Sequence, residues 1–139
     1  MSLHRIGDLP AALDKIALLL NSNGVVILND YGWELMDERS ARWYRDAWAR
    51  LGEGAAKGPA PASAQNALGD WRRDAADLHA AKDMLEALAA RFDEREFSWQ
   101  PYLARELGAL ELEPEEVQAI EQGKITAVGF FYCGALEDV

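Results

Sequence analysis

Residues 25–28 read Val-Val-Ile-Leu, and residues 125–132 read Ile-Thr-Ala-Val-Gly-Phe-Phe-Tyr. Both runs are rich in β-branched and aromatic residues, which favour strands, and the first run lies between Gly24 and Asn29. We predict that each run forms a buried strand and that the two strands pair into a small sheet. They lie near opposite ends of the sequence, so their pairing would tie the chain together around the helices between them.

Helical patterns occupy most of the remaining sequence, because apolar residues recur at helical spacing in five segments. The predicted helices span about residues 9–20, 37–51, 70–95, 101–108 and 114–122. The longest segment predicts a single helix that packs across the sheet. The predicted fold class is therefore α+β and helix-dominated, with about five helices and a small sheet formed by residues near 25–28 and 125–132.

The length of the chain indicates one domain. Its 139 residues are enough for one hydrophobic core and too few for two, so we predict a single domain over residues 1–139. Residues 52–69 contain four Gly and two Pro and show no apolar periodicity. This composition predicts a mobile Gly/Pro/Ala-rich loop at about 52–69.

The charge balance is acidic, with 24 Asp and Glu against 14 Lys and Arg, a net charge of −10. This disfavours duplex nucleic acid as a partner, since phosphate binding uses clustered cations. No apolar run has the length of a membrane helix, and the N-terminus does not have the pattern of a secretory signal. The single cysteine, Cys133, is compatible with a reducing compartment. We expect a cytoplasmic protein with no membrane partner. Its compactness and its Ala- and Arg-rich composition favour a bacterial source.

The segment Asn29–Glu34 is a candidate ligand-binding loop. It follows the carboxyl end of the first predicted strand, where ligand sites collect in folds that contain sheets. Asp30 and Glu34 carry carboxylates that suit a cation or acid–base chemistry, and Tyr31 and Trp33 would provide stacking walls. The alternative is a turn whose aromatic side chains fold back onto the core.

The predicted helix 37–51 is a candidate partner-binding element. Arg39, Arg42 and Arg45 are interleaved with Trp43, a combination that protein interfaces favour. The alternative is that the arginine stems cover a tryptophan at the rim of the core. Neither the histidines nor the cysteine fall in a pattern with enough metal ligands, so we expect no metal and no cofactor.

Two classes of function remain open. The first is a small acidic interaction or inhibitor protein, similar in kind to an immunity protein, which covers the basic surface of another protein. A homodimer is a second partner to consider, because a two-stranded sheet is weak alone and its edges invite further strands. The competing class is a small-ligand-binding protein or hydrolase with its site at the Asp30–Glu34 loop. Of the two, the sequence favours the interaction protein.

Overall fold

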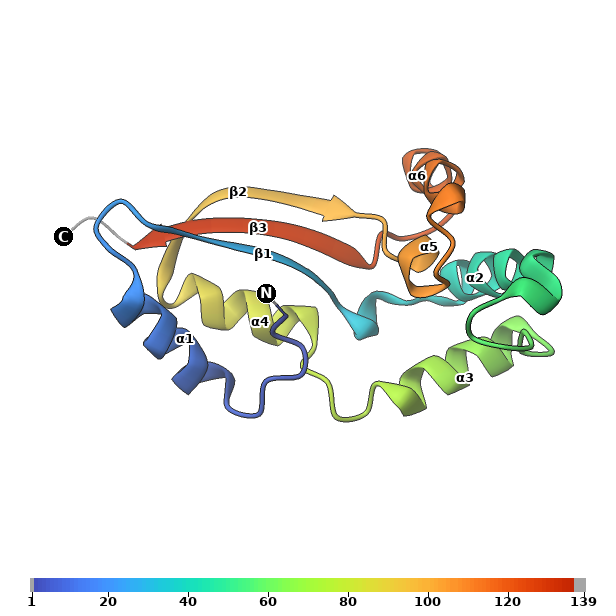
Figure 1. The fold of residues 1–139 in the computed structure, drawn as a ribbon, viewed down its shortest axis with the longest axis horizontal. Helices are drawn as coiled ribbons and strands as arrows, with labels where there is room; N and C mark the ends of the chain where they lie inside the picture. The colour runs from blue at the N-terminus through green and yellow to red at the C-terminus, as the bar shows by residue number, and fades with distance from the viewer. Residues whose placement is uncertain (1, 137–139) are drawn as a thin grey trace.

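A three-stranded antiparallel sheet forms the centre of the protein, described by a computed structural model over residues 2–136 (Figure 1). Its strands are β1 (Val25–Tyr31), β2 (Phe92–Gln100) and β3 (Gly129–Leu136), in the order β1-β3-β2. The predicted pairing is confirmed, because β1 pairs with β3 from Val25 opposite Ala135 to Tyr31 opposite Gly129. The second strand begins four residues later than predicted and continues to Leu136.

Within residues 2–136 the chain forms six α-helices, which confirms the helix-dominated α+β class. Three of them are α1 (Leu9–Leu19), α2 (Glu38–Leu51) and α3 (Ala64–Asp74). The others are α4 (Ala81–Ala89), the short α5 (Leu103–Glu106) and α6 (Glu113–Glu121). Single 3₁₀ turns occur at Trp33–Leu35, Gly52–Gly54 and Leu110–Leu112.

The prediction of one long helix over 70–95 is wrong. The chain leaves the helical path after Asp74, and α4 starts only at Ala81. Residues 92–100 form β2, in which Phe97 lies opposite Tyr132 and Trp99 lies opposite Phe130. The aromatic side chains therefore pack with those of β3 on one face of the sheet. Pairing with β3 overrides the helical pattern of this segment, which is rich in charged residues with good helix propensity.

The segment predicted as a loop over 52–69 is partly helical. Ser63 caps α3, because its side chain accepts a hydrogen bond from the backbone N–H of Asn66, and the helix begins at Ala64. Residues 55–63 remain irregular. Two side chains of α2 hold this shorter loop, since Trp48 donates to the Gly58 carbonyl and Arg45 to the Pro61 carbonyl. Its mobility stays a prediction.

The buried residues form two hydrophobic clusters, which lie at different places along the length of the sheet. Helices α1 and α4 cover one face of the sheet, while α2, α3, α5 and α6 gather beyond its other end (Figure 1). The first cluster lies between the sheet and α1 and α4 and includes Leu13, Val26, Leu28, Met84, Leu88, Phe130 and Tyr132. The second lies between α2, α5 and the start of β3 and includes Met36, Ala41, Tyr44, Leu103, Leu107 and Val128.

Glu116 of α6 holds the start of α5 in place. The residue is 1% exposed, and its carboxylate accepts hydrogen bonds from the backbone N–H groups of Tyr102, Leu103 and Ala104 at 2.8–3.0 Å. These groups have no partner inside a helix that begins at this point. The carboxylate therefore satisfies three donors at once and fixes α5 against α6.

Replacing Glu116 by Ala should lower the free energy of unfolding by about 3 kcal/mol or more, because it leaves buried N–H groups without an acceptor. Glu115→Ala on the same helix is the control. Glu115 is exposed and, among the residues that the structure describes, its one ion pair is with Arg50, so its loss should cost less than about 1 kcal/mol. Urea unfolding of the two variants measures the difference, and equal costs would contradict this role of Glu116.

Tyr132 is the one buried side chain within residues 2–136 whose polar atom has no hydrogen-bond partner. Its ring lies over Gly134, where an added Cβ would clash with the Tyr132 hydroxyl oxygen. Glycine is therefore required beside this ring. Burial, with a smaller contribution from the Glu94 carboxylate, raises the pKa of Tyr132 to about 12.

Tyr132→Phe should be as stable as the parent at pH 7 or more stable by up to about 2 kcal/mol, because it removes an unsatisfied hydroxyl. The unfolded chain loses this proton near pH 10, whereas the folded chain keeps it to about pH 12. The parent should therefore lose stability more steeply than the variant between these pH values. Unfolding curves across this range test both statements; a variant that is less stable than the parent at pH 7 would contradict the first.

Candidate functional site

Asp30 lies in β1 and anchors the N-terminal segment. The segment predicted as a loop over Asn29–Glu34 is strand as far as Tyr31, because β1 continues to pair with β3 up to Gly129. The buried Asp30 carboxylate accepts hydrogen bonds from the backbone N–H groups of Leu3 at 2.7 Å and Tyr31 at 2.9 Å. The ring nitrogen Nδ1 of His4 lies 2.5 Å from its Oδ1 atom. The lone pairs of Asp30 are therefore occupied by the protein itself.

Glu34 caps a helix that is distant in the sequence. Its two carboxylate oxygens accept hydrogen bonds from the backbone N–H groups of Ala81 at 2.8 Å and Lys82 at 3.0 Å, at the start of α4. The neighbouring Trp33 donates its indole N–H to the Leu78 carbonyl at 3.1 Å. Asp30 and Glu34 therefore bind different backbone segments, and the two carboxylates do not share a site.

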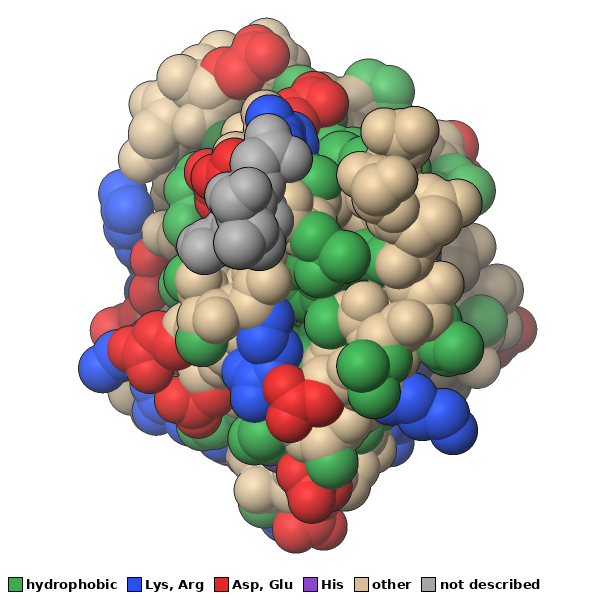
Figure 2. Space-filling model, turned by 90° about the vertical axis from the view of Figure 1, so that its left-hand side faces the viewer, with side chains coloured by type: hydrophobic (Ala, Val, Ile, Leu, Met, Phe, Trp, Pro, Cys, Tyr) green, Lys and Arg blue, Asp and Glu red, His purple; other side chains and the backbone are tan. Residues whose placement is uncertain are grey.

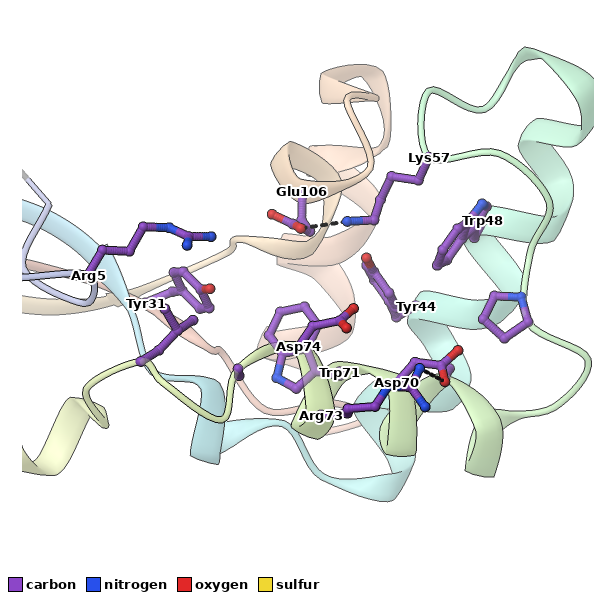
Figure 3. Close-up of a pocket in the computed structure, with 14 residues that line it drawn as sticks. Arg5, Tyr31, Tyr44, Trp48, Lys57, Asp70, Trp71, Arg73, Asp74 and Glu106 are labelled. Atoms are coloured by element: carbon purple, nitrogen blue, oxygen red, sulfur yellow. Dashed lines mark hydrogen bonds and ion pairs between the residues drawn. The ribbon is translucent and has the colours of Figure 1, made fainter.

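Tyr31 lies at a cavity of about 340 Å³ between α2, α3, α5 and the loop 55–63 (Figure 3). A row of rings in edge-to-face contact forms one wall of this cavity. The ring centroids of Tyr31 and Trp71 are 5.8 Å apart, those of Trp71 and Tyr44 are 5.6 Å apart, and those of Tyr44 and Trp48 are 5.7 Å apart. Tyr102 stacks on Tyr31 at 4.1 Å from behind. We refer to this space as the aromatic cavity.

Charged side chains surround the aromatic cavity. Two ion pairs are already formed there: Lys57 to Glu106 at 2.7 Å, and Arg73 to Asp70 at 2.7 Å. The Lys57 ammonium also lies 6.0 Å from the centroid of the Trp48 ring. Arg5 and Asp74 line the cavity as well, and neither forms an ion pair within residues 2–136.

The hydroxyl groups at the aromatic cavity stay protonated at physiological pH. Burial raises the pKa of Tyr31 and Tyr44 above the usual value, and the Glu106 carboxylate raises both further. Burial and Glu106 raise the pKa of Tyr102 in the same way, and its hydroxyl donates to Glu106 at 3.0 Å. The cavity therefore presents neutral hydroxyl groups between charged neighbours.

The four residues predicted to bind a partner all lie on α2 but do not share one surface. Arg39, Arg42 and Trp43 line a shallow hollow together with Lys124 and Ile125. Arg39 donates to the Gly123 carbonyl at 2.9 Å, and Trp43 packs against the second hydrophobic cluster. Arg45 points elsewhere and donates to the Pro61 carbonyl at 3.0 Å.

Most residues of the aromatic cavity could not be identified from the sequence. Of those predicted to bind ligand, only Tyr31 lines it. Trp71 and Tyr44 carried a recognisable signal as apolar positions of helices, which indicates burial and not a site. Arg5, Lys57, Asp74 and Glu106 come from four separate segments, and nothing in their local sequence indicates that these segments meet.

Within residues 2–136, no group of three or more His, Cys, Asp or Glu side chains is placed to hold a metal ion. In the same part of the chain, no helix combines the length and the apolar character needed to cross a membrane. Comparisons with protein-family models, with curated proteins and with solved structures gave no match to this chain. The function must therefore be argued from its own surfaces and cavities.

Asp30→Ala should lower the free energy of unfolding by about 2–4 kcal/mol, because the backbone N–H groups of Leu3 and Tyr31 lose their buried acceptor. Asp46→Ala, which removes an exposed carboxylate of α2, should stay within about 0.5 kcal/mol of the parent. Chemical denaturation compares the two. An Asp30 variant as stable as the parent would show that this carboxylate does not serve the fold.

Proposed function

We propose that this protein acts as an interaction protein of the inhibitor type, and that its partner binds along residues 16–29. These residues include the end of α1, the turn and most of β1, and we call them the α1–β1 segment. The observation that carries the proposal is the exposure of four large aliphatic side chains there. Leu18 is 86% exposed, Leu19 76%, Val25 47% and Ile27 52%, whereas only two other large hydrophobic residues within residues 2–136 are as exposed as these.

The α1–β1 segment also carries no charge. Residues 16–29 contain no Asp, Glu, Lys or Arg, although 27% of the whole chain is charged. Figure 2 shows the end of the molecule at which α1 and the start of β1 lie, with hydrophobic side chains near its centre and charged ones around them. Exposed apolar surface rimmed by polar groups is typical of a protein-binding site.

The two edges of the sheet differ in a way that favours binding at β1. The outer edge of β1 forms no backbone hydrogen bond over residues 25–29 with any part of the chain that the structure describes. The other edge strand, β2, carries four successive charged residues, Asp93, Glu94, Arg95 and Glu96. Charges of this kind protect an edge from added strands, and β1 has none between Val25 and Asn29.

The partner that fits this edge is a protein that adds an apolar strand beside β1. Backbone hydrogen bonds would give such a complex its affinity, and contacts with Val25 and Ile27 its specificity. The net charge of −10 attracts a positively charged protein and accelerates encounter. An acidic protein that covers a basic partner in this way acts as an inhibitor.

The hollow on α2 is a weaker candidate for the same role. It lies at the end of the molecule opposite the α1–β1 segment (Figure 1). Arg39 and Arg45 are held by backbone carbonyls, and Arg42 lies 3.9 Å from Glu38. These arginines would have to leave partners within the protein before they could bind a second molecule.

Ile27→Lys should weaken binding of the partner by about tenfold or more, because it places a charge at the centre of the uncharged edge. The partner is first identified by photo-crosslinking from position 27 in a native lysate and is then purified for calorimetry. The matched control is Arg42→Ala on α2, which should change the affinity by less than about twofold. Circular dichroism and urea unfolding verify that both variants are folded.

Two outcomes would overturn this proposal. A loss of affinity with Arg42→Ala but not with Ile27→Lys would place the partner on α2. The second outcome is a particle of twice the chain mass in light scattering of the purified protein alone, which Ile27→Lys returns to a monomer. A second copy of the chain would then occupy the edge. If the proposal is right, the rate at which the partner associates with this protein also falls as the salt concentration rises, since salt screens the attraction between the two opposite charges.

A further inference from the structure

The aromatic cavity combines apolar walls with charged side chains, and the binding of a protein at the α1–β1 segment does not use it. Its wall consists of the rings of Tyr31, Trp71, Tyr44 and Trp48 in edge-to-face contact, and Pro61 and Ala67 close the cavity on the side of the loop and α3. A volume of about 340 Å³ lies at the lower end of the range for small-molecule sites. The space suits a molecule of amino-acid size with a flat apolar part.

The free charges at the aromatic cavity differ in sign and in place. Arg5 extends from the N-terminal segment beside Tyr31, and Asp74 extends from α3 on the side of Tyr44 (Figure 3). The other charged side chains there neutralise one another, since Lys57 pairs with Glu106 and Arg73 with Asp70. One guanidinium and one carboxylate therefore remain for a ligand.

We propose that the aromatic cavity binds a small zwitterion of the α-amino acid class, with an aromatic side chain. The ligand carboxylate lies against Arg5, the ligand ammonium lies against Asp74, and the side chain packs on the ring of Trp48. A guanidinium binds carboxylates with two parallel hydrogen bonds, and ring faces attract an ammonium group. A ligand with only one of the two charges would leave Arg5 or Asp74 unmatched.

The tyrosine hydroxyl groups favour the same ligand. Tyr31 and Tyr44 keep their protons at physiological pH, so each can donate to a carboxylate oxygen and accept from an ammonium group. Tyr44 is nearly fully buried, and its ring position is fixed by contacts with Trp48 and Trp71. The hydroxyl groups and the two free charges then select the zwitterion over a neutral aromatic compound.

Calorimetry of the full chain with three probes tests the proposal. The probes are L-phenylalanine, its N-acetyl derivative, which lacks the ammonium group, and its carboxamide, which lacks the carboxylate. L-phenylalanine should bind with saturation. The affinity of each derivative should be lower by about tenfold or more, since each derivative loses one charge-assisted contact. No saturable binding of L-phenylalanine at millimolar concentration would overturn the proposal.

Two variants assign each end of the ligand. With Arg5→Gln, L-phenylalanine and its carboxamide should bind equally, because the carboxylate no longer has its partner. With Asp74→Asn, L-phenylalanine and its N-acetyl derivative should bind equally, because the ammonium group no longer has its partner. If the preference for the zwitterion survives in both variants, the orientation proposed here is wrong.

Arg95→Gln and Asp83→Asn serve as matched controls. Both residues are exposed and lie outside the aromatic cavity, so all three probes should bind to these variants as they do to the parent. Circular dichroism verifies the fold of all four variants. The result is independent of the partner-binding experiment, because Ile27→Lys should leave L-phenylalanine binding unchanged.

Discussion

Backbone N–H groups that lie at the start of a segment need an acceptor. Asp8 and Asp37 supply it to their own helices, and three further carboxylates supply it from another part of the chain. Asp30 holds the N-terminal segment, Glu34 the start of α4, and Glu116 the start of α5. Asp30 and Glu34 join parts of the chain that are far apart in sequence, and Glu116 joins α5 to α6. Asp30 and Glu116 are buried, and burying a carboxylate is costly unless several donors satisfy it, as they do at both residues.

The elements that the sequence predicts well are those with a strong local pattern. The runs at Val25 and Phe130 have the composition of buried strands, and β1 and β3 pair in the structure. The sequence does not predict β2, because the first half of this strand is charged and exposed, and only its pairing with β3 places Phe97 against the first hydrophobic cluster. The break between α3 and α4 depends likewise on distant groups, since Glu34 caps α4 and Trp33 binds the Leu78 carbonyl.

The candidate sites also include residues that the local sequence indicates and residues that only the tertiary structure brings together. Tyr31 stands out in the sequence as an aromatic residue at a strand end, and it does line the aromatic cavity. The carboxylates beside it have the composition of a ligand site, yet their acceptor atoms are taken by backbone N–H groups far away in the sequence. Arg5 and Asp74 line the same cavity because Trp71 of α3 contacts Tyr31 at the end of β1. Such a site is a product of the tertiary structure and has no linear motif.

The unprotected edge of β1 has a consequence for how this protein behaves in concentrated solution. Nothing in residues 16–29 repels another copy of the chain, so mutual repulsion must come from the net charge of −10 carried by the remaining residues. This repulsion vanishes as the pH approaches the isoelectric point near 4.6. Solubility therefore depends on charges that lie away from this edge, and acidification removes the repulsion that keeps the edges of two copies apart.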